Sequence, residues 1–266
     1  IAIGMRFDDR VTGKLETYAK QARIIHFDID PSEINKNVKV DVAVVGNCKQ
    51  TLQRVTEQVE PARHQAWVDG FKPYEDKEDY KVIQPAIHPT EGPLLMGEVV
   101  RAVSEATAHK AILVTSGGCG TMGFGLPAAI GATFGAPERT VCMFCGDGGL
   151  QMTIQELGTI MEQQSPVKII LLNNNFLGNV RQWQYMFFQK RYSFTPMLNP
   201  VYEQISAAYG IPSRTVIDRA DLNDAISEML STDGPFLLQC AIKEEDNVLP
   251  MTPPGASVDE MLLDIK

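Results

Sequence analysis

The sequence predicts an α/β protein with two α/β regions, the second of them a doubly wound parallel sheet. Residues 140–145 and 167–172 are short, nearly unbroken apolar runs, as expected for strands that are covered on both faces. Between them, the apolar residues of 155–164 recur at helical spacing. Strand, helix and strand in this order are typical of a βαβ unit, which joins two parallel neighbours in a sheet.

Strand-like and helical stretches alternate along the rest of the chain. Residues 1–3 form a strand-like start, residues 24–30 a strand that ends in acids, and residues 40–46 a further strand. Residues 61–93 are rich in Pro, Lys, Asp and Glu and have weak periodicity, which predicts an extended connection on the surface. The acids and prolines beyond this second α/β region predict a tail that folds over a site. The predicted parts are residues 1–60, a linker at 61–93, the domain 94–243 and the tail 244–266.

Composition limits the function classes. The chain has 266 residues, 44% of them hydrophobic, which is enough for one large or two ordinary cores. Its net charge of −9 argues against nucleic acid as a partner, and no apolar stretch reaches membrane-spanning length. Five scattered cysteines among apolar neighbours indicate reduced thiols and a cytoplasmic location. The start at Ile1, with neither an initiator Met nor a signal peptide, suggests a piece of a longer protein.

The strongest functional signal is a pair of polar strand ends. Gly146-Asp147-Gly148-Gly149 closes one apolar run, and Asn173-Asn174-Asn175 closes the next. Asp147 and Asn174 are 27 residues apart, the length of one βαβ unit, so both side chains are expected at the carboxyl edge of a parallel sheet. Carboxylate and carboxamide oxygens suit Mg²⁺, which completes its octahedron with phosphate oxygens and water. The alternative is an ordinary βαβ unit that happens to have polar strand ends.

This pattern resembles the diphosphate-binding signature of enzymes that use thiamine diphosphate, in which Gly-Asp-Gly opens the motif and Asn-Asn closes it. Three further stretches narrow the resemblance: Gly4 to Gly13 (GMRFDDRVTG), Thr115 to Gly131 (TSGGCGTMGFGLPAAIG) and Val180 to Gln184 (VRQWQ). Together they resemble the catalytic subunits of acetolactate synthase over nearly the full length. The resemblance implies the end of a Rossmann-like central domain associated with FAD, followed by the domain that binds the diphosphate.

The resemblance assigns thiamine diphosphate and Mg²⁺ to one set of residues. Asp147 and Asn174 would be side-chain ligands of Mg²⁺, together with the main-chain carbonyl of Phe176. Met122 would hold the cofactor in its bent form and Trp183 would line the substrate funnel, although each of them alone is more often a core residue. The full predicted set comprises the catalytic residues Met122 and Trp183 and the cofactor-binding residues Gly120, Thr121, Met122, Asp147, Gly148, Gly149, Asn174, Phe176, Leu177, Gly178 and Asn179.

A second set is assigned to FAD. A strand that ends at Gly4 and an acid, Asp28, that closes the next strand fit a Rossmann-like nucleotide site, but no complete G-x-G-x-x-G is present. The alternative for the charged residues near Gly4 is a solvated cluster at a turn. The resemblance implies that the flavin contacts are Gly4, Met5, Arg6, Phe7, Asp8, Asp28, Ile29, Asn47 and Cys48.

The sequence also departs from the family pattern. In the family, an acidic segment that contacts the cofactor separates the strand at 111–115 from the Ser-Gly-Gly run, whereas here Ser116 follows Thr115 directly. We expect either a disordered loop omitted from the numbering or a true deletion. Asn179 stands where relatives usually carry Met, and Asn47 where they tend to carry Asp. The family's pyrimidine-binding domain, with its activating glutamate, would lie outside these residues.

The activity implied is decarboxylation of pyruvate and transfer of the two-carbon unit to a second pyruvate or to 2-ketobutyrate, in branched-chain amino acid biosynthesis. FAD would be structural, the protein a homodimer or tetramer, and a small regulatory subunit a further partner; the 266 residues alone are expected to be inactive. Two rival hypotheses are another thiamine diphosphate-dependent decarboxylase or carboligase without flavin, and a nucleotide-binding module without catalysis. The Arg6 to Gly13 run and Trp183 argue against the first rival.

Overall fold

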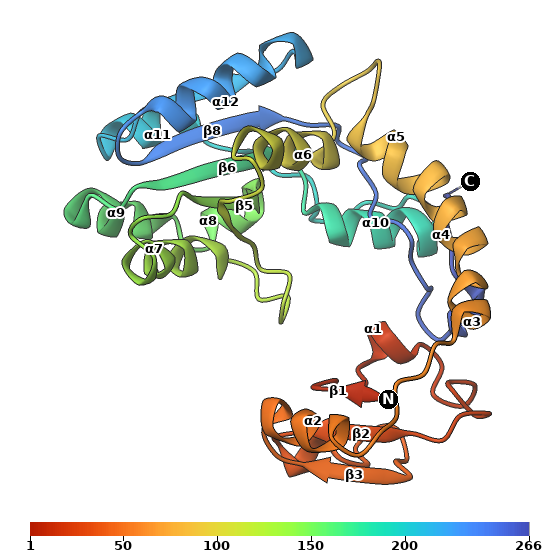
Figure 1. Cartoon of the computed structure of the whole chain (residues 1–266). Coiled ribbons are helices and arrows are strands. Elements are labelled where there is room, and N and C mark those ends of the chain that lie inside the picture. Colours follow the sequence, from red (N-terminus) through yellow and green to blue (C-terminus); the bar gives the residue numbers. More distant parts are fainter. Residues whose placement is uncertain (266) are drawn as a thin grey trace. The chain divides into compact units, whose positions relative to one another are not determined.

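The computed structural model describes residues 1–265, which fall into two compact units (Figure 1). The first unit comprises residues 1–82 together with the chain from Leu249 onward, and the second comprises residues 83–248. Both units are built on parallel sheets with interleaved helices, so the predicted α/β class is confirmed. Each unit is described separately below.

The sheet of the first unit has three short parallel strands in the order β1-β2-β3. These are β1 (Ala2–Ile3), β2 (Ile25–Asp28) and β3 (Val42–Val45), with helices α1 (Asp9–Thr12) and α2 (Cys48–Thr56). The central strand is shorter than predicted because its acids form a turn. The Asp28 carboxylate accepts the backbone N–H of Asp30 at 2.9 Å, and the Asp30 side chain caps the single 3₁₀ turn at Pro31–Glu33.

The linker predicted as an extended connection is largely helical. It forms α3 (Gln65–Asp69), α4 (Lys72–Glu78), a π-helical turn (Asp79–Ile83) and α5 (Gln84–Ile87). Two of its five prolines, Pro73 and Pro85, lie in the first turns of α4 and α5, where a missing N–H removes no helical hydrogen bond. Its charged residues pair along the surface, as Lys72 and Asp69 do at 3.2 Å. Proline and charge content alone therefore gave the wrong backbone for this segment.

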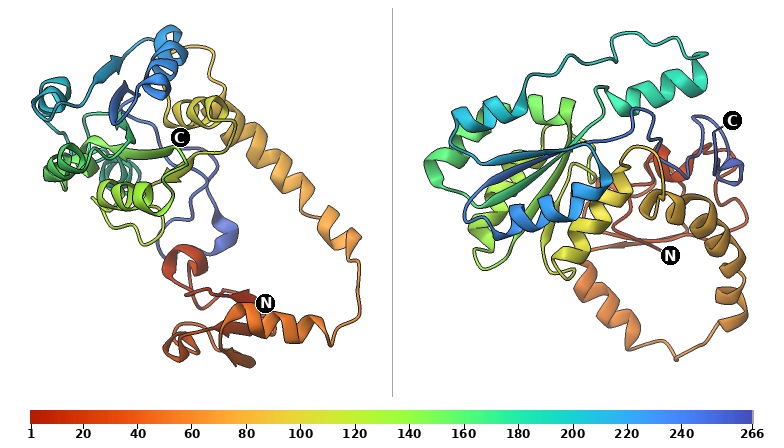
Figure 2. Two further views of the ribbon diagram at one scale, coloured as in Figure 1. Left: turned by 60° about the vertical axis from the view of Figure 1, so that its left-hand side comes forward. Right: turned by 90° about the horizontal axis from the view of Figure 1, so that it is seen from above.

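The second unit contains the doubly wound sheet, in the strand order β4-β5-β6-β8-β7 with every pair parallel. The strands are β4 (Ile112–Val114), β5 (Val141–Gly146), β6 (Val167–Asn173), β7 (Ser213–Val216) and β8 (Phe236–Ala241). Helices cover both faces (Figures 1 and 2): α6 (Met96–Ala106) and α12 (Leu222–Ser231) pack on one, and α7 (Gly125–Gly135), α9 (Leu157–Gln163) and α11 (Tyr202–Ala208) on the other.

Side chains alternate between two cores along the central strands. In β5, Cys142 and Phe144 join the core under α6 and α12, whereas Val141 and Met143 join the core under α7 and α9. Every residue of β6 is buried, as expected of a strand covered on both faces. Cys142 and Cys145 belong to opposite cores, so the prediction that they are core residues is confirmed, whereas Cys119 is exposed.

The chain is continuous where a loop was expected to be missing. The structure follows β4 directly through Thr115 into Ser116, and the backbone N–H of Gly117 donates to Thr115 Oγ1 at 3.2 Å. The backbone N–H of Gly120 donates to the Ser116 carbonyl at 3.0 Å, which closes a compact turn. The expectation of an omitted disordered loop is therefore wrong, and the short connection belongs to the sequence itself.

Among residues 1–265, none of the helices has the length and apolar character needed to cross a membrane.

Candidate diphosphate and metal site

Asp147 lies at the carboxyl edge of the sheet, at the point where β5 passes into α8 (Asp147–Gln151). Gly146 adopts an extended conformation, and the helix begins at the next residue. The Asp147 side chain is almost fully buried. Burial raises the pKa of its carboxyl group, and hydrogen bonds from the Asn199 side chain and the Gly148 backbone partly oppose this rise. A buried carboxylate at a strand end is a strong candidate for binding a cation.

The asparagine run follows β6 at the same edge. Gly146 is paired with Leu172 in the parallel register, so Asp147 and Asn173 come next to each other at the ends of adjacent strands. The loop turns because Asn175 adopts a left-handed backbone conformation, with φ of 57°, and its N–H donates to Asn173 Oδ1 at 3.1 Å. Helix α10 (Gly178–Phe187) begins directly after the loop. The predicted convergence of the two strand ends is thus confirmed.

The Asn199 side chain links these strand ends. Its Nδ2 donates to Asp147 Oδ2 at 2.6 Å, to Asn173 Oδ1 at 3.1 Å and to Asn175 Oδ1 at 3.0 Å. The Asn174 amide takes part in other contacts: its Nδ2 donates to the Glu244 carbonyl at 3.5 Å, and its Oδ1 accepts the Phe176 N–H at 3.3 Å. Alternation along the strand accounts for the difference, since successive side chains point to opposite faces.

Glycines allow other side chains to pack closely beside Asp147. A Cβ on Gly148 would lie 2.7 Å from Leu177 Cδ2, 2.9 Å from Met122 Cε and 3.1 Å from Met197 Sδ. These contacts bring two predicted cofactor residues, Met122 and Leu177, onto the first turn of α8. Gly178 is close in the same way to the Asn174 amide, at 3.0 Å. A cavity of about 60 Å³ adjoins this point, and its lining includes Met122, Gly146 and Gly149.

The other predicted residues of this site lie around it. Gly120 and Thr121 belong to the exposed turn before α7, and Gly120 has a left-handed φ of 70°. Asn179 is exposed in the first turn of α10. Trp183 is half-buried on the same helix and packs edge-to-face with Phe187, the ring centres lying 5.6 Å apart. The substrate role of Trp183 stays a prediction.

Arg181 is a residue to which the sequence analysis gave no role. It is buried on α10, where its Nη1 donates to the Glu244 carbonyl at 3.2 Å and its Nη2 pairs with Glu245. Its guanidinium lies 4.3 Å from the ring centre of Phe176 and 4.7 Å from that of Tyr192. Arg181 thereby fastens the asparagine loop to the segment that follows β8.

Asn199, Gln151 and Tyr202 were also missed. The side chains of Gln151 and Tyr202 both donate to Asn199 Oδ1, at 2.8 Å and 3.1 Å. No local pattern marks these residues, because Asn199 is 52 positions from Asp147 and lies in an irregular stretch. Among these three, only Gln151 could have been found from sequence, because it stands one helical turn after Asp147.

The predicted flavin residues lie at the carboxyl edge of the sheet in the first unit. Gly4 follows β1 with a left-handed φ of 61°, Asp28 ends β2, and Asn47 caps α2 by accepting the N–H of Lys49. Phe7 is buried and packs edge-to-face on His26, with ring centres 5.0 Å apart, and its carbonyl accepts the Asn37 side chain at 3.0 Å. The remaining members of this set are Met5, the Arg6–Asp8 ion pair at 2.8 Å, exposed Ile29 and half-buried Cys48.

The arrangement around Asp147 fits Mg²⁺ and a diphosphate. Within residues 1–265, no cluster of three or more His, Cys, Asp or Glu side chains could bind a metal ion. A cation at Asp147 would therefore have one carboxylate, with amide and main-chain oxygens and the phosphates of a ligand as its other partners. This mixture is typical of Mg²⁺ and of no softer metal. The Asn199 amide nitrogen occupies the point on which the side-chain oxygens of Asp147, Asn173 and Asn175 converge, so a cation would bind on another side of the carboxylate.

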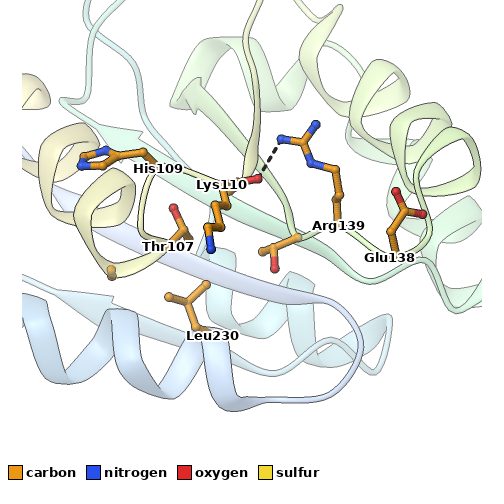
Figure 3. Close-up of a pocket in the computed structure, with 9 residues that line it drawn as sticks. Thr107, His109, Lys110, Glu138, Arg139 and Leu230 are labelled. Atoms are coloured by element: carbon orange, nitrogen blue, oxygen red, sulfur yellow. Dashed lines mark hydrogen bonds between the residues drawn. The ribbon is translucent and has the colours of Figure 1, made fainter.

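A larger depression of about 700 Å³ lies at the opposite edge of the sheet (Figure 3). Its lining includes Lys110 before β4 and Glu138 and Arg139 before β5, so it marks the amino ends of the strands. Arg139 donates to the Lys110 carbonyl at 2.7 Å. Ligands of doubly wound sheets bind at the carboxyl ends of the strands, which excludes this depression as the diphosphate site.

A glycine-flanked aspartate after one buried strand and an asparagine loop after the next, in a doubly wound parallel sheet, define the diphosphate-binding domain of thiamine diphosphate-dependent enzymes. Residues 97–240 match the family described as thiamine pyrophosphate enzyme, C-terminal TPP binding domain. Residues 1–55 match thiamine pyrophosphate enzyme, central domain. The chain belongs to the thiamine pyrophosphate enzyme family.

Its relatives narrow the comparison to acetolactate synthase large subunits. The chain is 40% identical over 284 residues to acetolactate synthase isozyme 2 large subunit of Escherichia coli (strain K12), with 98% of this chain and 51% of that protein covered. It is 38% identical to the large subunit of Parasynechococcus marenigrum (strain WH8102), covering 98% and 46%, and 36% identical to the chloroplastic acetolactate synthase 1 of Nicotiana tabacum, covering 98% and 44%. The chain therefore spans about half the length of these relatives.

The match to the Escherichia coli protein is longer than this chain. It extends over 284 residues against 266, so that relative has at least 18 residues in the matched region that are missing here. This agrees with the direct connection from Thr115 to Ser116. The prediction that the connection after β4 is shortened relative to the family is consistent with both observations.

Proposed function

We propose that these residues supply the diphosphate and metal site of an acetolactate synthase catalytic subunit. The observation that carries the proposal is the buried Asp147 carboxylate at a strand end, in register with the asparagine loop. The similarity to acetolactate synthase large subunits over 98% of the chain favours this enzyme within the wider family.

Asp147, Asn174 and the carbonyl of Phe176 are the proposed Mg²⁺ ligands. Asn174 Oδ1 accepts the Phe176 N–H at 3.3 Å, and the second lone pair of this amide oxygen is available for the cation. Gly148, Gly149 and Gly178 are proposed to let the backbone come close to the phosphates, with Gly120, Thr121, Leu177 and Asn179 around them. When bound, thiamine diphosphate supplies the electron sink for decarboxylation of a 2-keto acid.

The task of the chain itself is positioning. Met122 reaches Gly148 from the turn before α7, so a cofactor in this space would lie against its flexible side chain. Trp183 on α10 would form a wall for the second 2-keto acid, pyruvate or 2-ketobutyrate. Fixed placement of the reactants and exclusion of water are the two contributions that such a shell makes to carboligation.

FAD, oligomerisation and regulation extend the proposal to the first unit and to partners. The nine predicted flavin residues gather at one sheet edge, where nucleotides bind in parallel α/β sheets. A homodimer or tetramer and a small regulatory subunit are proposed from the relatives that are named large subunits. Branched-chain amino acid biosynthesis in the cytoplasm is the setting that this assignment implies.

A second candidate function is carboligation or decarboxylation without flavin by another member of the family. The Gly-Asp-Gly and asparagine elements alone would serve such an enzyme equally well. Residues 1–55, which include Gly4 to Gly13, match the central domain of the wider family and so fit both candidates. The similarity of this region to acetolactate synthase large subunits is what favours the first candidate. Binding of FAD to the purified chain, followed by flavin absorbance after gel filtration, distinguishes the two.

The activity test compares two preparations. Residues 1–266 alone, with thiamine diphosphate, Mg²⁺ and FAD, are expected to bind the cofactors without forming acetolactate, because they span about half of their relatives. The same residues joined to the unmatched half of the Escherichia coli relative are expected to form it, as measured by conversion to acetoin and colorimetry. Substantial turnover by residues 1–266 alone would overturn the assignment of the other half of the site to a separate region.

A further inference from the structure

Asn199 occupies a central place in the hydrogen-bond network around Asp147. A short antiparallel backbone contact between the asparagine loop and the segment before α11 places Asn199 in this position. The Leu177 N–H donates to the Thr195 carbonyl at 2.9 Å, and the Met197 N–H donates to the Asn175 carbonyl at 2.8 Å. Asn199 follows two residues later, so its approach to Asp147 is imposed by backbone pairing and not by a flexible side chain alone.

The orientation of the Asn199 amide is determined on both sides. Gln151 Nε2 and the Tyr202 hydroxyl both donate to its Oδ1, so its Nδ2 must face the three oxygens of Asp147, Asn173 and Asn175. Gln151 lies one turn after Asp147 on α8, and the amide therefore bridges two residues of the same helix to the neighbouring strand end. A reversed amide would place oxygen against three oxygens.

The consequence for the carboxylate is geometric. Asn199 holds Oδ2 of Asp147 at 2.6 Å, while Oδ1 accepts the Gly148 N–H at 3.0 Å. Each carboxylate oxygen can accept more than one partner, so the carboxylate is fixed in rotation and retains capacity for a cation. Hydrogen bonds of this kind to ligating carboxylates orient the group and strengthen metal binding.

Building on the function proposed above, we propose that Asn199 is a positioning residue of the cation site, which holds the Asp147 carboxylate and the asparagine loop at the spacing that the cation and diphosphate require. It contributes no bond to the cation. Gln151 acts through it by fixing the amide orientation. No local sequence pattern identifies the role of Asn199, because it depends on contacts between positions about 50 residues apart.

The test is a titration of the full chain with Mn²⁺ in the presence of thiamine diphosphate, with free Mn²⁺ measured by electron paramagnetic resonance. Asn199→Ala is expected to weaken Mn²⁺ binding by about 10- to 100-fold, the usual loss when the partner of a metal-binding group is removed. Gln151→Ala is expected to weaken it less. The double variant should bind as Asn199→Ala does, since Gln151 acts through Asn199. Asn223→Ala, an exposed asparagine on α12, is the matched control and should bind as the unmodified chain does.

Three results would overturn the inference. Equal Mn²⁺ affinity of Asn199→Ala and the unmodified chain would show that the amide positions nothing. Losses that add in the double variant would show two independent structural effects. An unmodified chain that binds no Mn²⁺ with thiamine diphosphate would remove the proposed function itself, and the inference with it. Thermal unfolding without Mn²⁺ checks that each variant is folded. If Asn199→Ala does not fold, the Mn²⁺ affinity of Gln151→Ala decides: weaker binding supports the inference and unchanged binding overturns it.

Discussion

The replacement of Asp147 by asparagine separates the role of the carboxylate in binding from its role in the fold. The side chain is almost fully buried, and burial raises the pKa of its carboxyl group, so the ionised form is less favourable here than in water. Asp147→Asn removes that cost and keeps the shape. It also replaces one of the two carboxylate oxygens by an amide NH2, so either the Asn199 amide or the Gly148 N–H loses its acceptor; the loss is about 1.5–3 kcal/mol for a charged acceptor, and removal of the buried charge offsets part of it. Without cofactor, the free energy of unfolding should change by less than about 2 kcal/mol.

With cofactor, the two proteins should differ clearly. At a cofactor concentration about 100 times its dissociation constant, binding adds about 2.7 kcal/mol to the stability of the folded state. For a unit of this size, about 1 kcal/mol corresponds to a shift in melting temperature of about 2–4 °C, so the unmodified chain should gain about 5–11 °C. Asp147→Asn should gain nothing, because the charged ligand of the cation is gone.

The assay is thermal unfolding followed by circular dichroism, with and without thiamine diphosphate and Mg²⁺. Asp246→Asn is the matched control: this second carboxyl group also has its pKa raised by burial, but it accepts the Met96 N–H at 2.7 Å, outside the Asp147 network. Its cofactor-induced shift should be retained. A full shift in Asp147→Asn would refute the reasoning, since it would show that the cation is bound elsewhere.

Two further predictions concern the core and the substrate wall. Burial raises the pKa of the Cys240 thiol to about 12, so its stabilising contribution is complete below about pH 9 and is lost as the pH rises through the folded-state pKa. Between pH 9 and 10.5, the free energy of unfolding in urea should fall by about 1.4 kcal/mol per pH unit less in Cys240→Ala than in the unmodified chain. Cys119→Ala, which removes an exposed thiol, should fall as steeply as the unmodified chain. Equal slopes in all three proteins would contradict the assignment. Trp183→Leu in the active enzyme should leave thiamine diphosphate binding nearly intact and shift the choice between pyruvate and 2-ketobutyrate by about 1–3 kcal/mol, read from the product ratio in competition. An unchanged ratio with a loss of cofactor affinity would make Trp183 a scaffold residue.

Local pattern was sufficient for the elements that bury both faces. The strands at 141–146 and 167–173 and the helix at 157–163 were predicted within a few residues, because a strand covered on two sides has few ways to satisfy its apolar run. The neighbouring strand ends also followed from the spacing of Asp147 and the asparagine run, since one crossover unit returns the chain to the same edge. The prediction for segment 61–93 was wrong because its helices are short, and their apolar side chains, such as Trp67 and Phe71, are exposed and not part of a core.

The tertiary structure decided which groups meet at the site. The sequence marks Asp147 and an asparagine run, but alternation and the turn at Asn175 determine that Asn173 and Asn175, with Asn199, share the network of the carboxylate. Arg181 and Glu244 meet only because β8 lies next to β6 in the sheet. The motif and its spacing by themselves thus determined where the two polar strand ends meet and that a carboxylate lies there. The partners that orient that charge come from distant segments, and only chain folding brings them within hydrogen-bond distance.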